Sequence, residues 1–157
     1  DDLIKIQADS LGWDWRLMAS IIYQESRFNP ESESWAGAQG LMQMMPATAK
    51  RFDVEDLTDP EENLEGGTRL LKLLWNRFDE IPDSVQRIKL TLAAYNCGYS
   101  HVVDAQNLAK EMGVLHPEHW FANLSINGKR QGLYFAMEEF STGTLEKLGS
   151  GLIGSEN

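Results

Sequence analysis

Apolar residues recur at helical spacing through most of the chain. Met18, Ile21 and Ile22 share one face of a predicted helix that begins after Asp14, a typical N-cap residue, and ends near Glu25. Because Glu25 continues the same stripe, its carboxyl group is expected at the C-terminal end of a row that faces the core. The pattern therefore predicts an acid that is partly removed from water.

Further helices are predicted where a cap, a proline or a glycine coincides with the limits of an apolar period. A loop of small and acidic residues over 31–40 separates the early helices. These further helices span residues 2–11, 41–52, 60–78, 83–97 and 99–113, and a last one is marked by Leu133, Met137 and Phe140. The sequence shows no strand alternation and no internal repeat. The predicted fold class is therefore all-α, built of packed short helices.

Two of these helices carry local predictions. Asp59 is expected to cap the helix over 60–78, with Glu62 as its capping-box partner. The pair Gly66-Gly67 inside that helix indicates a close helix–helix crossing, although a kink would also account for it. The buried row of the next helix is expected to be Val85, Ile88, Leu92 and Tyr95.

Length and composition are typical of one globular domain. The chain has 157 residues, of which 42% are hydrophobic. We place the domain at residues 1–148 and expect a loose tail at 149–157. The sequence starts without an initiator methionine, so we expect it to be a mature or excised piece of a longer protein.

Charge and residue usage narrow the choice of partners. The net charge of -10 argues against nucleic acid, because the field of the protein repels phosphate. No apolar run reaches the length of a membrane span, so we expect no membrane contact from this segment itself. The single Cys97 excludes an internal disulfide. His101, His116 and His119 lack a metalloprotease pattern, and we expect neither a metal nor a cofactor.

The expected position of Glu25 has a chemical consequence. Removal from water disfavours the charged carboxylate, and the C-terminal end of a helix carries partial negative charge, so both effects raise the pKa. A carboxyl group that stays protonated near neutral pH is suited to general acid catalysis. A glutamate that only ends a helix and reaches into water is the commoner situation. The neighbouring motifs decide between the two.

Three short motifs follow one another at compatible spacing. They are ESRFNP at 25–30, GLMQMMP at 40–46 and AAYNCG at 93–98. Together they resemble the soluble lytic transglycosylase (SLT) domain of the lysozyme-like superfamily, over about Trp13 to Gly98. The arrangement is also similar to the catalytic module of membrane-bound lytic murein transglycosylase F. The resemblance implies a lysozyme-like fold, in which short helices surround a substrate cleft.

The resemblance also implies an activity. SLT domains cleave the β-1,4 bond between N-acetylmuramic acid and N-acetylglucosamine in peptidoglycan, and the muramic acid's own 6-hydroxyl closes onto its anomeric carbon to leave a 1,6-anhydro end. Glu25 matches the family's catalytic acid and base. Cleft residues are matched by Ser34, Gln43, Met45 and Tyr95. Asn96 completes the last motif and is a further candidate, for which we expect a mostly structural role.

Beyond Gly98 the resemblance fades. Tyr134 is a candidate for a tyrosine that many relatives carry in their final helix. Trp120 and Phe121 suit core packing at least as well as sugar stacking. The cleft residues of this part of the chain stay open.

Two alternatives to a lytic transglycosylase stay open. One is a goose-type lysozyme that hydrolyses the same bond, and the other is a module that binds peptidoglycan without cutting it. The expected partners are peptidoglycan glycan strands and muropeptides, and the expected role is cell-wall remodelling. From the resemblance alone we also expect an N-terminal, solute-binding-like regulatory domain in the full-length protein, and a periplasmic location with tethering to the outer membrane.

Overall fold

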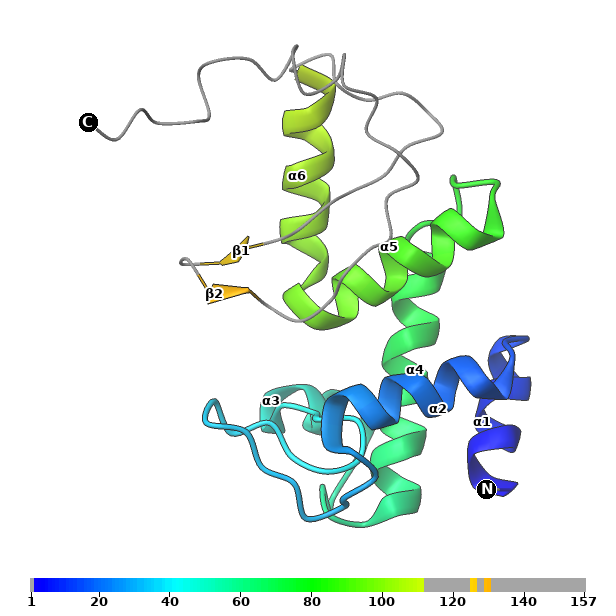
Figure 1. The fold of residues 1–157 in the computed structure, drawn as a ribbon, viewed down its shortest axis with the longest axis vertical. Helices are drawn as coiled ribbons and strands as arrows, with labels where there is room; N and C mark the ends of the chain where they lie inside the picture. The colour runs from blue at the N-terminus through cyan, green and yellow to red at the C-terminus, as the bar shows by residue number, and fades with distance from the viewer. Residues whose placement is uncertain (1, 112–124, 127–128, 131–157) are drawn as a thin grey trace. The chain divides into compact units, whose positions relative to one another are not determined.

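The computed structural model describes residues 2–111, 125–126 and 129–130, and the chain forms two compact units, Asp1–Arg77 and Phe78–Asn157 (Figure 1). Helices α1 to α6 make up most of the described residues, which confirms the predicted all-α class. A two-stranded antiparallel hairpin, β1 (Ser125–Ile126) and β2 (Lys129–Arg130), pairs Ser125 with Arg130 and was not predicted. The predicted last helix and the predicted tail lie outside the described residues.

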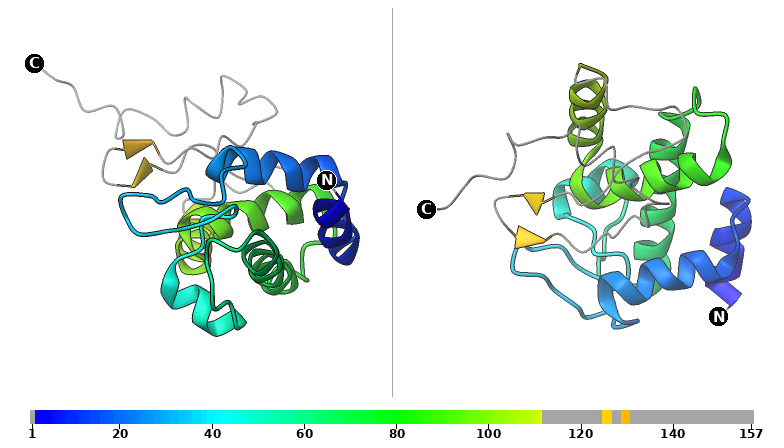
Figure 2. Two further views of the ribbon diagram at one scale, coloured as in Figure 1. Left: turned by 90° about the horizontal axis from the view of Figure 1, so that it is seen from below. Right: turned by 45° about the horizontal axis from the view of Figure 1, so that its top comes forward.

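The first unit is built around three helices. Helix α1 (Asp2–Leu11) contacts both α2 (Trp15–Ser26) and α4 (Pro60–Asn76), as Figure 2 illustrates. The apolar stripe of α2 is buried as predicted, since Met18 and Ile22 are fully buried and Ile21 nearly so. Leu64 and Leu71 of α4 are also fully buried. These side chains form the core against which the end of α2 is placed.

Both ends of α2 are fixed by hydrogen bonds. The Asp14 carboxylate accepts the Arg16 N–H at 2.8 Å, which confirms the predicted N-cap. At the other end, Arg27 takes a left-handed conformation (φ 54°) and its N–H donates to the Tyr23 carbonyl at 3.0 Å. Glu25 therefore lies in the last turn of the helix, where the sequence predicted it.

The predicted helix over 41–52 is wrong in its first half. Helical structure begins only at Pro46, with α3 (Pro46–Ala49) followed by the 3-10 helix η1 (Lys50–Phe52). Before Pro46 the backbone forms a bridge instead of helical hydrogen bonds, because the Met44 N–H donates to the Gln39 carbonyl at 2.9 Å. Gln43 has a positive φ of 49°, which a continuous right-handed helix does not allow.

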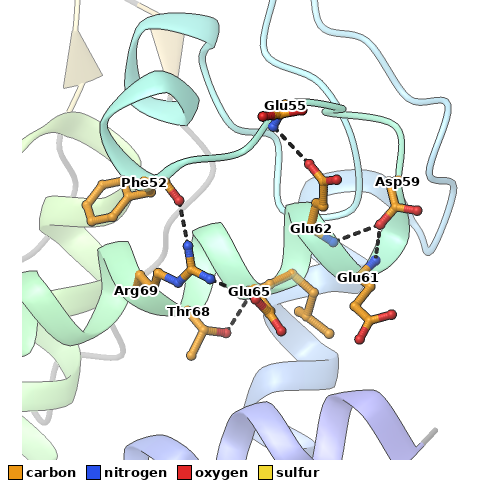
Figure 3. A network of polar contacts seen from close by, with 9 residues as sticks. Phe52, Glu55, Asp59, Glu61, Glu62, Glu65, Thr68 and Arg69 are labelled. Carbon is orange, nitrogen blue, oxygen red and sulfur yellow. Dashed lines mark hydrogen bonds and ion pairs between the residues drawn. The ribbon is translucent and has the colours of Figure 1, made fainter.

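The start of α4 is capped as predicted, but by a different arrangement of side chains. The Asp59 carboxylate accepts the Glu61 and Glu62 N–H groups at 3.0 and 2.8 Å (Figure 3). The Glu62 carboxylate does not close a capping box. It accepts the Glu55 and Asp56 N–H groups at 2.8 and 3.0 Å and so fixes the loop before the helix.

The Gly66-Gly67 pair marks a close approach, but not to another helix. A Cβ at Gly66 would collide with the Val54 side chain and would lie 3.0 Å from Met44 Sδ. A Cβ at Gly67 would collide with Met42 Sδ. The two glycines therefore admit the methionines of the GLMQMMP motif against α4, and the predicted helix crossing is replaced by packing against this non-helical segment.

The second unit contains α5 (Ser84–Cys97) and α6 (Tyr99–Glu111), which contact each other. The Asp83 carboxylate caps α5 by accepting the Gln86 N–H at 2.7 Å. The predicted buried row of α5 is wrong, because Val85 is 57% exposed and the fully or nearly buried residues are Leu90, Thr91, Ala93 and Ala94. The small residues Ala93 and Ala94 of the AAYNCG motif are thus buried, where larger side chains were expected to be.

Within the described part of the chain, no helix has both the length and the apolar character required to cross a membrane.

Candidate active site

Glu25 stands out by the state of its carboxyl group. The side chain is partly buried beside the fully buried stripe of α2, and burial raises its pKa from the ordinary value of 4.5 to about 7. Among the residues that the structure describes, no hydrogen bond or ion pair to this carboxyl group is found. The predicted raised pKa is therefore confirmed with desolvation as its cause, and the contribution of the helix end stays a prediction.

The loop that follows α2 is organised by backbone hydrogen bonds. Gln39 pairs with Met44 in both directions, at 3.0 and 2.9 Å, and also bridges Glu33. The Gly40 N–H donates to the Ser32 carbonyl at 3.0 Å. Two of the three motifs, ESRFNP and GLMQMMP, are thus joined by a folded segment of fixed shape.

Asn63 of α4 anchors this segment, and the sequence analysis missed it. Its side chain is fully buried, accepts the Met42 N–H at 2.8 Å and donates to the Gln39 and Leu57 carbonyls at 3.0 and 2.9 Å. A Cβ on Gly40 would collide with the Leu57 carbonyl and with this amide. The signal that was available is a polar residue directly before Leu64 in a buried row, since buried amides require partners.

Gln43 supports the loop with its side chain. Its Nε2 donates to the Ser32 and Gly40 carbonyls at 2.9 and 3.0 Å, so both amide hydrogens are used within the protein. Two carbonyl neighbours fix the orientation of this amide. The Oε1 atom remains as an acceptor. In this arrangement the Gln43 side chain offers a ligand its acceptor oxygen rather than its amide hydrogens.

Ser34 and Met45 take different positions in the same segment. The Ser34 hydroxyl oxygen accepts the Ala38 N–H at 3.0 Å, and its hydroxyl proton is available to donate to a ligand. Met45 caps α3, where its carbonyl accepts the Thr48 and Ala49 N–H groups at 2.8 and 2.9 Å, and its side chain is 43% exposed. Met42 and Met44 are buried and belong to the core.

Tyr95 and Asn96 belong to the second unit. Tyr95 is partly buried near the end of α5, whereas the neighbouring Asn96 is exposed. Burial raises the pKa of the Cys97 thiol, which keeps it in the unreactive protonated form. The assigned roles of Tyr95 and Asn96 stay predictions. Tyr134, Trp120 and Phe121 lie outside the described residues.

The described residues contain no group of three or more His, Cys, Asp or Glu side chains that is arranged to hold a metal ion.

The profile of the transglycosylase SLT domain family matches residues 2–114. The chain belongs to this family. The candidates up to Gly98 all lie within the matched range, namely Glu25, Ser34, Gln43, Met45, Tyr95 and Asn96. A second profile, described as CotH kinase protein, matches residues 104–152 and covers too little of the chain to show membership of that family.

Relatives of this SLT domain carry one recurring name. The chain is 46% identical over 118 residues to a membrane-bound lytic murein transglycosylase F of Desulfosudis oleivorans, an alignment that covers 75% of the chain and 26% of the relative. The protein of the same name from Aeromonas salmonicida is 41% identical, with 76% and 23% covered. The chain thus spans about a quarter of the length of these curated relatives.

A solved structure supports the same fold. The 70 kDa soluble lytic transglycosylase of Escherichia coli is 31% identical to the chain and superposes with a TM-score of 0.58, covering 69% of the chain and 18% of that protein. The fold of this SLT domain is therefore the lysozyme-like fold that the motifs implied.

Proposed function

We propose that the chain is the catalytic domain of a peptidoglycan lytic transglycosylase, with Glu25 as its acid and base. The observation that carries this proposal is the pKa of about 7 at Glu25, in the motif where the SLT family places its catalytic acid. A carboxyl group that titrates near the working pH is able both to donate and to accept a proton during one turnover.

The reaction divides into two proton transfers. Protonated Glu25 donates to the oxygen of the β-1,4 glycosidic bond, the bond from that oxygen to the anomeric carbon of N-acetylmuramic acid breaks, and the N-acetylglucosamine end leaves as an alcohol. The acetamido oxygen of the muramic acid stabilises the anomeric carbon. The Glu25 carboxylate then removes the proton of the 6-hydroxyl, whose oxygen bonds to the anomeric carbon and closes the 1,6-anhydro ring.

Most glycosidases require a second carboxylate, and this site offers none close to Glu25 in sequence except Glu31 and Glu33. Both of these side chains are exposed. Stabilisation by the substrate's own acetamido group removes the requirement, as in other substrate-assisted glycosidases. One acid with a raised pKa, Glu25, therefore fits the proposed chemistry.

The loop residues are assigned supporting roles. Gln43 accepts a hydrogen bond from a substrate N–H or hydroxyl through its free Oε1, and Ser34 donates to the acetamido group or a nearby sugar oxygen. Met45 supplies an apolar wall, for which its exposure leaves surface available. Tyr95 provides a phenol for the acid or the acetamido group, and Asn96 supports the end of α5.

Product analysis tests the proposed function. Purified protein is incubated with cell-wall sacculi, and the released muropeptides are separated and weighed by mass spectrometry. Anhydro ends, lighter than hydrolysed ends by one water, support the proposal. Reducing ends alone favour the goose-type lysozyme, and undegraded sacculi with bound protein favour the binding module.

The setting in the cell follows from the named relatives and is proposed only. The substrate class is peptidoglycan and its muropeptides, and the location is the periplasm, with tethering to the outer membrane through the full-length protein. An N-terminal, solute-binding-like domain is proposed to regulate this segment. Fractionation of cells expressing the complete gene, with detection of the protein in the inner-membrane, outer-membrane and periplasmic fractions, tests the location.

A further inference from the structure

Trp35 is the most exposed large hydrophobic side chain of the described residues. It is 94% exposed, whereas the next of this kind, Ile6, is 62% exposed. An indole in water leaves a large apolar surface unburied, and tryptophan is enriched at interfaces where an apolar ring meets a partner. The exposure is therefore an observation that the catalytic role of Glu25 does not explain.

The backbone around Trp35 is held in a hydrogen-bonded turn. The Ser34 N–H donates to the Ala38 carbonyl at 2.9 Å, and the Gly37 N–H donates to the Ser34 carbonyl at 2.9 Å. The Ala38 N–H completes the turn by donating to the Ser34 hydroxyl oxygen at 3.0 Å. Because three hydrogen bonds close the turn, ligand binding at the indole costs little further backbone conformational entropy.

The turn continues directly into the candidate site. Ser34, the residue before the indole, is itself a candidate substrate ligand, and the bridge from Glu33 to Gln39 leads on to Met44. A glycan strand bound at Ser34 and Gln43 would therefore contact, at Ser34, the residue that directly precedes Trp35 in the sequence. This continuity is the reason for choosing a saccharide as the occupant of the indole face.

The charge of the turn selects between the two sugars of the strand. Glu31 and Glu33 are exposed beside Trp35, and the sequence has no lysine or arginine from Phe28 to Ala49. Muramic acid carries a peptide with carboxylates, which this local charge repels, whereas N-acetylglucosamine is uncharged. The axial C–H groups on one face of a pyranose ring match the negative face of an indole.

We propose that Trp35 is a stacking platform for an uncharged N-acetylglucosamine ring of the glycan strand, in a subsite formed by the turn from Ser34 to Ala38. The inference rests on the proposed function, because it takes peptidoglycan as the substrate. It adds a sugar-binding residue and a preference between the two sugars of the strand.

Binding of chito-oligosaccharide, an uncharged oligomer of N-acetylglucosamine, tests this subsite. The affinity is measured by calorimetry in the Glu25→Gln protein, so that no turnover interferes. Adding Trp35→Ala is expected to weaken binding about tenfold, as for the loss of one aromatic contact, and Trp35→Phe to recover most of it. Trp15→Ala is the matched control, since Trp15 is also exposed, at 42%, and is expected to leave the affinity unchanged.

Acrylamide quenching of tryptophan fluorescence gives a second readout. Trp35 is expected to contribute a strongly quenched component in the free protein, identified by its loss in Trp35→Phe, and chito-oligosaccharide is expected to protect it. Weak quenching of Trp35 in the free protein would overturn the proposal, as would an unchanged affinity in Trp35→Ala with an unchanged melting temperature.

The outcomes separate this inference from the proposed function. If the wild-type protein releases anhydro muropeptides while Trp35→Ala binds chito-oligosaccharide as well as its parent, only the stacking platform is rejected. If the wild-type protein leaves sacculi intact and the Glu25→Gln protein does not bind the oligomer, both proposals fail.

Discussion

The end of α2 and the start of α4 both carry glutamates, and the protein places them in opposite environments. Glu25 is partly buried, and burial holds its pKa at about 7. At the start of α4, the Glu62 carboxylate accepts two backbone N–H groups, those of Glu55 and Asp56. The Asp59 carboxylate accepts two more (Figure 3). Hydrogen bonds to the Thr58 hydroxyl and N–H likewise lower the pKa of Asp56.

The difference teaches how one chain separates catalytic acids from structural ones. A carboxylate that receives N–H groups at a helix N-terminus is stabilised in its charged form and holds backbone in place. A carboxyl group that loses water without gaining donors is stabilised in its protonated form instead. The two glutamates differ in environment, and the predictions below use the same kind of substitution to separate their roles.

The largest effect is expected from Glu25→Gln. The amide keeps the size of the side chain but neither donates nor accepts a proton at the glycosidic oxygen, so turnover is expected to fall at least about a thousandfold. Release of anhydro muropeptides from sacculi measures it. Glu33→Gln, at an exposed position in the neighbouring loop, is the control and is expected to retain activity. Near-normal turnover of Glu25→Gln would remove Glu25 from the acid role.

The next largest effect is expected from Asn63→Ala, which tests the scaffold rather than the acid. The substitution leaves the Met42 N–H and the Gln39 and Leu57 carbonyls without their buried partner. We expect a loss of about 3 kcal/mol in the free energy of unfolding, measured by urea denaturation. Thr68→Ala, which removes one intrahelical bond from a buried hydroxyl of the same helix, is the control with a smaller loss. Equal losses in the two variants would contradict the anchoring role.

The sequence predicted the parts of this comparison that depend on local periodicity and caps. The stripe of α2 and the caps Asp14 and Asp59 follow from apolar spacing and from side chains that bind free N–H groups, and all are found. The raised pKa of Glu25 was predictable for the same reason, because its place on the stripe fixes its burial.

The parts that failed depend on contacts distant in sequence. The GLMQMMP motif has helical spacing, yet Asn63, some twenty residues away, takes the Met42 N–H and keeps the segment out of a helix. Glu62 was assigned to a capping box and instead holds the loop at Glu55. The buried face of α5 was misplaced, since Ala93 and Ala94 are buried while Val85 is exposed. The periodicity of apolar residues in one sequence does not reveal such contacts.

The pH dependence of stability sharpens the comparison. Because the folded-state pKa of Glu25 is raised, folded protein binds its proton more tightly than unfolded protein, so the stability present below pH 4.5 is lost as the pH rises to about 7. Allowing for partial solvent exposure, the loss is about 2 kcal/mol. Urea denaturation at pH 4 and pH 8 is expected to show this loss in the wild type and not in Glu25→Gln. The rate of muropeptide release is expected to fall above pH 7 as the acid deprotonates.

The smallest effect is expected from Glu62→Gln, the same chemical change at the opposite kind of site. The amide oxygen still accepts the Glu55 and Asp56 N–H groups, but the bonds lose the charge of the carboxylate, so we expect about 1 kcal/mol less stability. The muropeptide release rate and its pH profile are expected to stay those of the wild type. A pH profile shifted from that of the wild type would mean that Glu62 and Glu25 are coupled, because a purely structural carboxylate has no proton to contribute to the reaction.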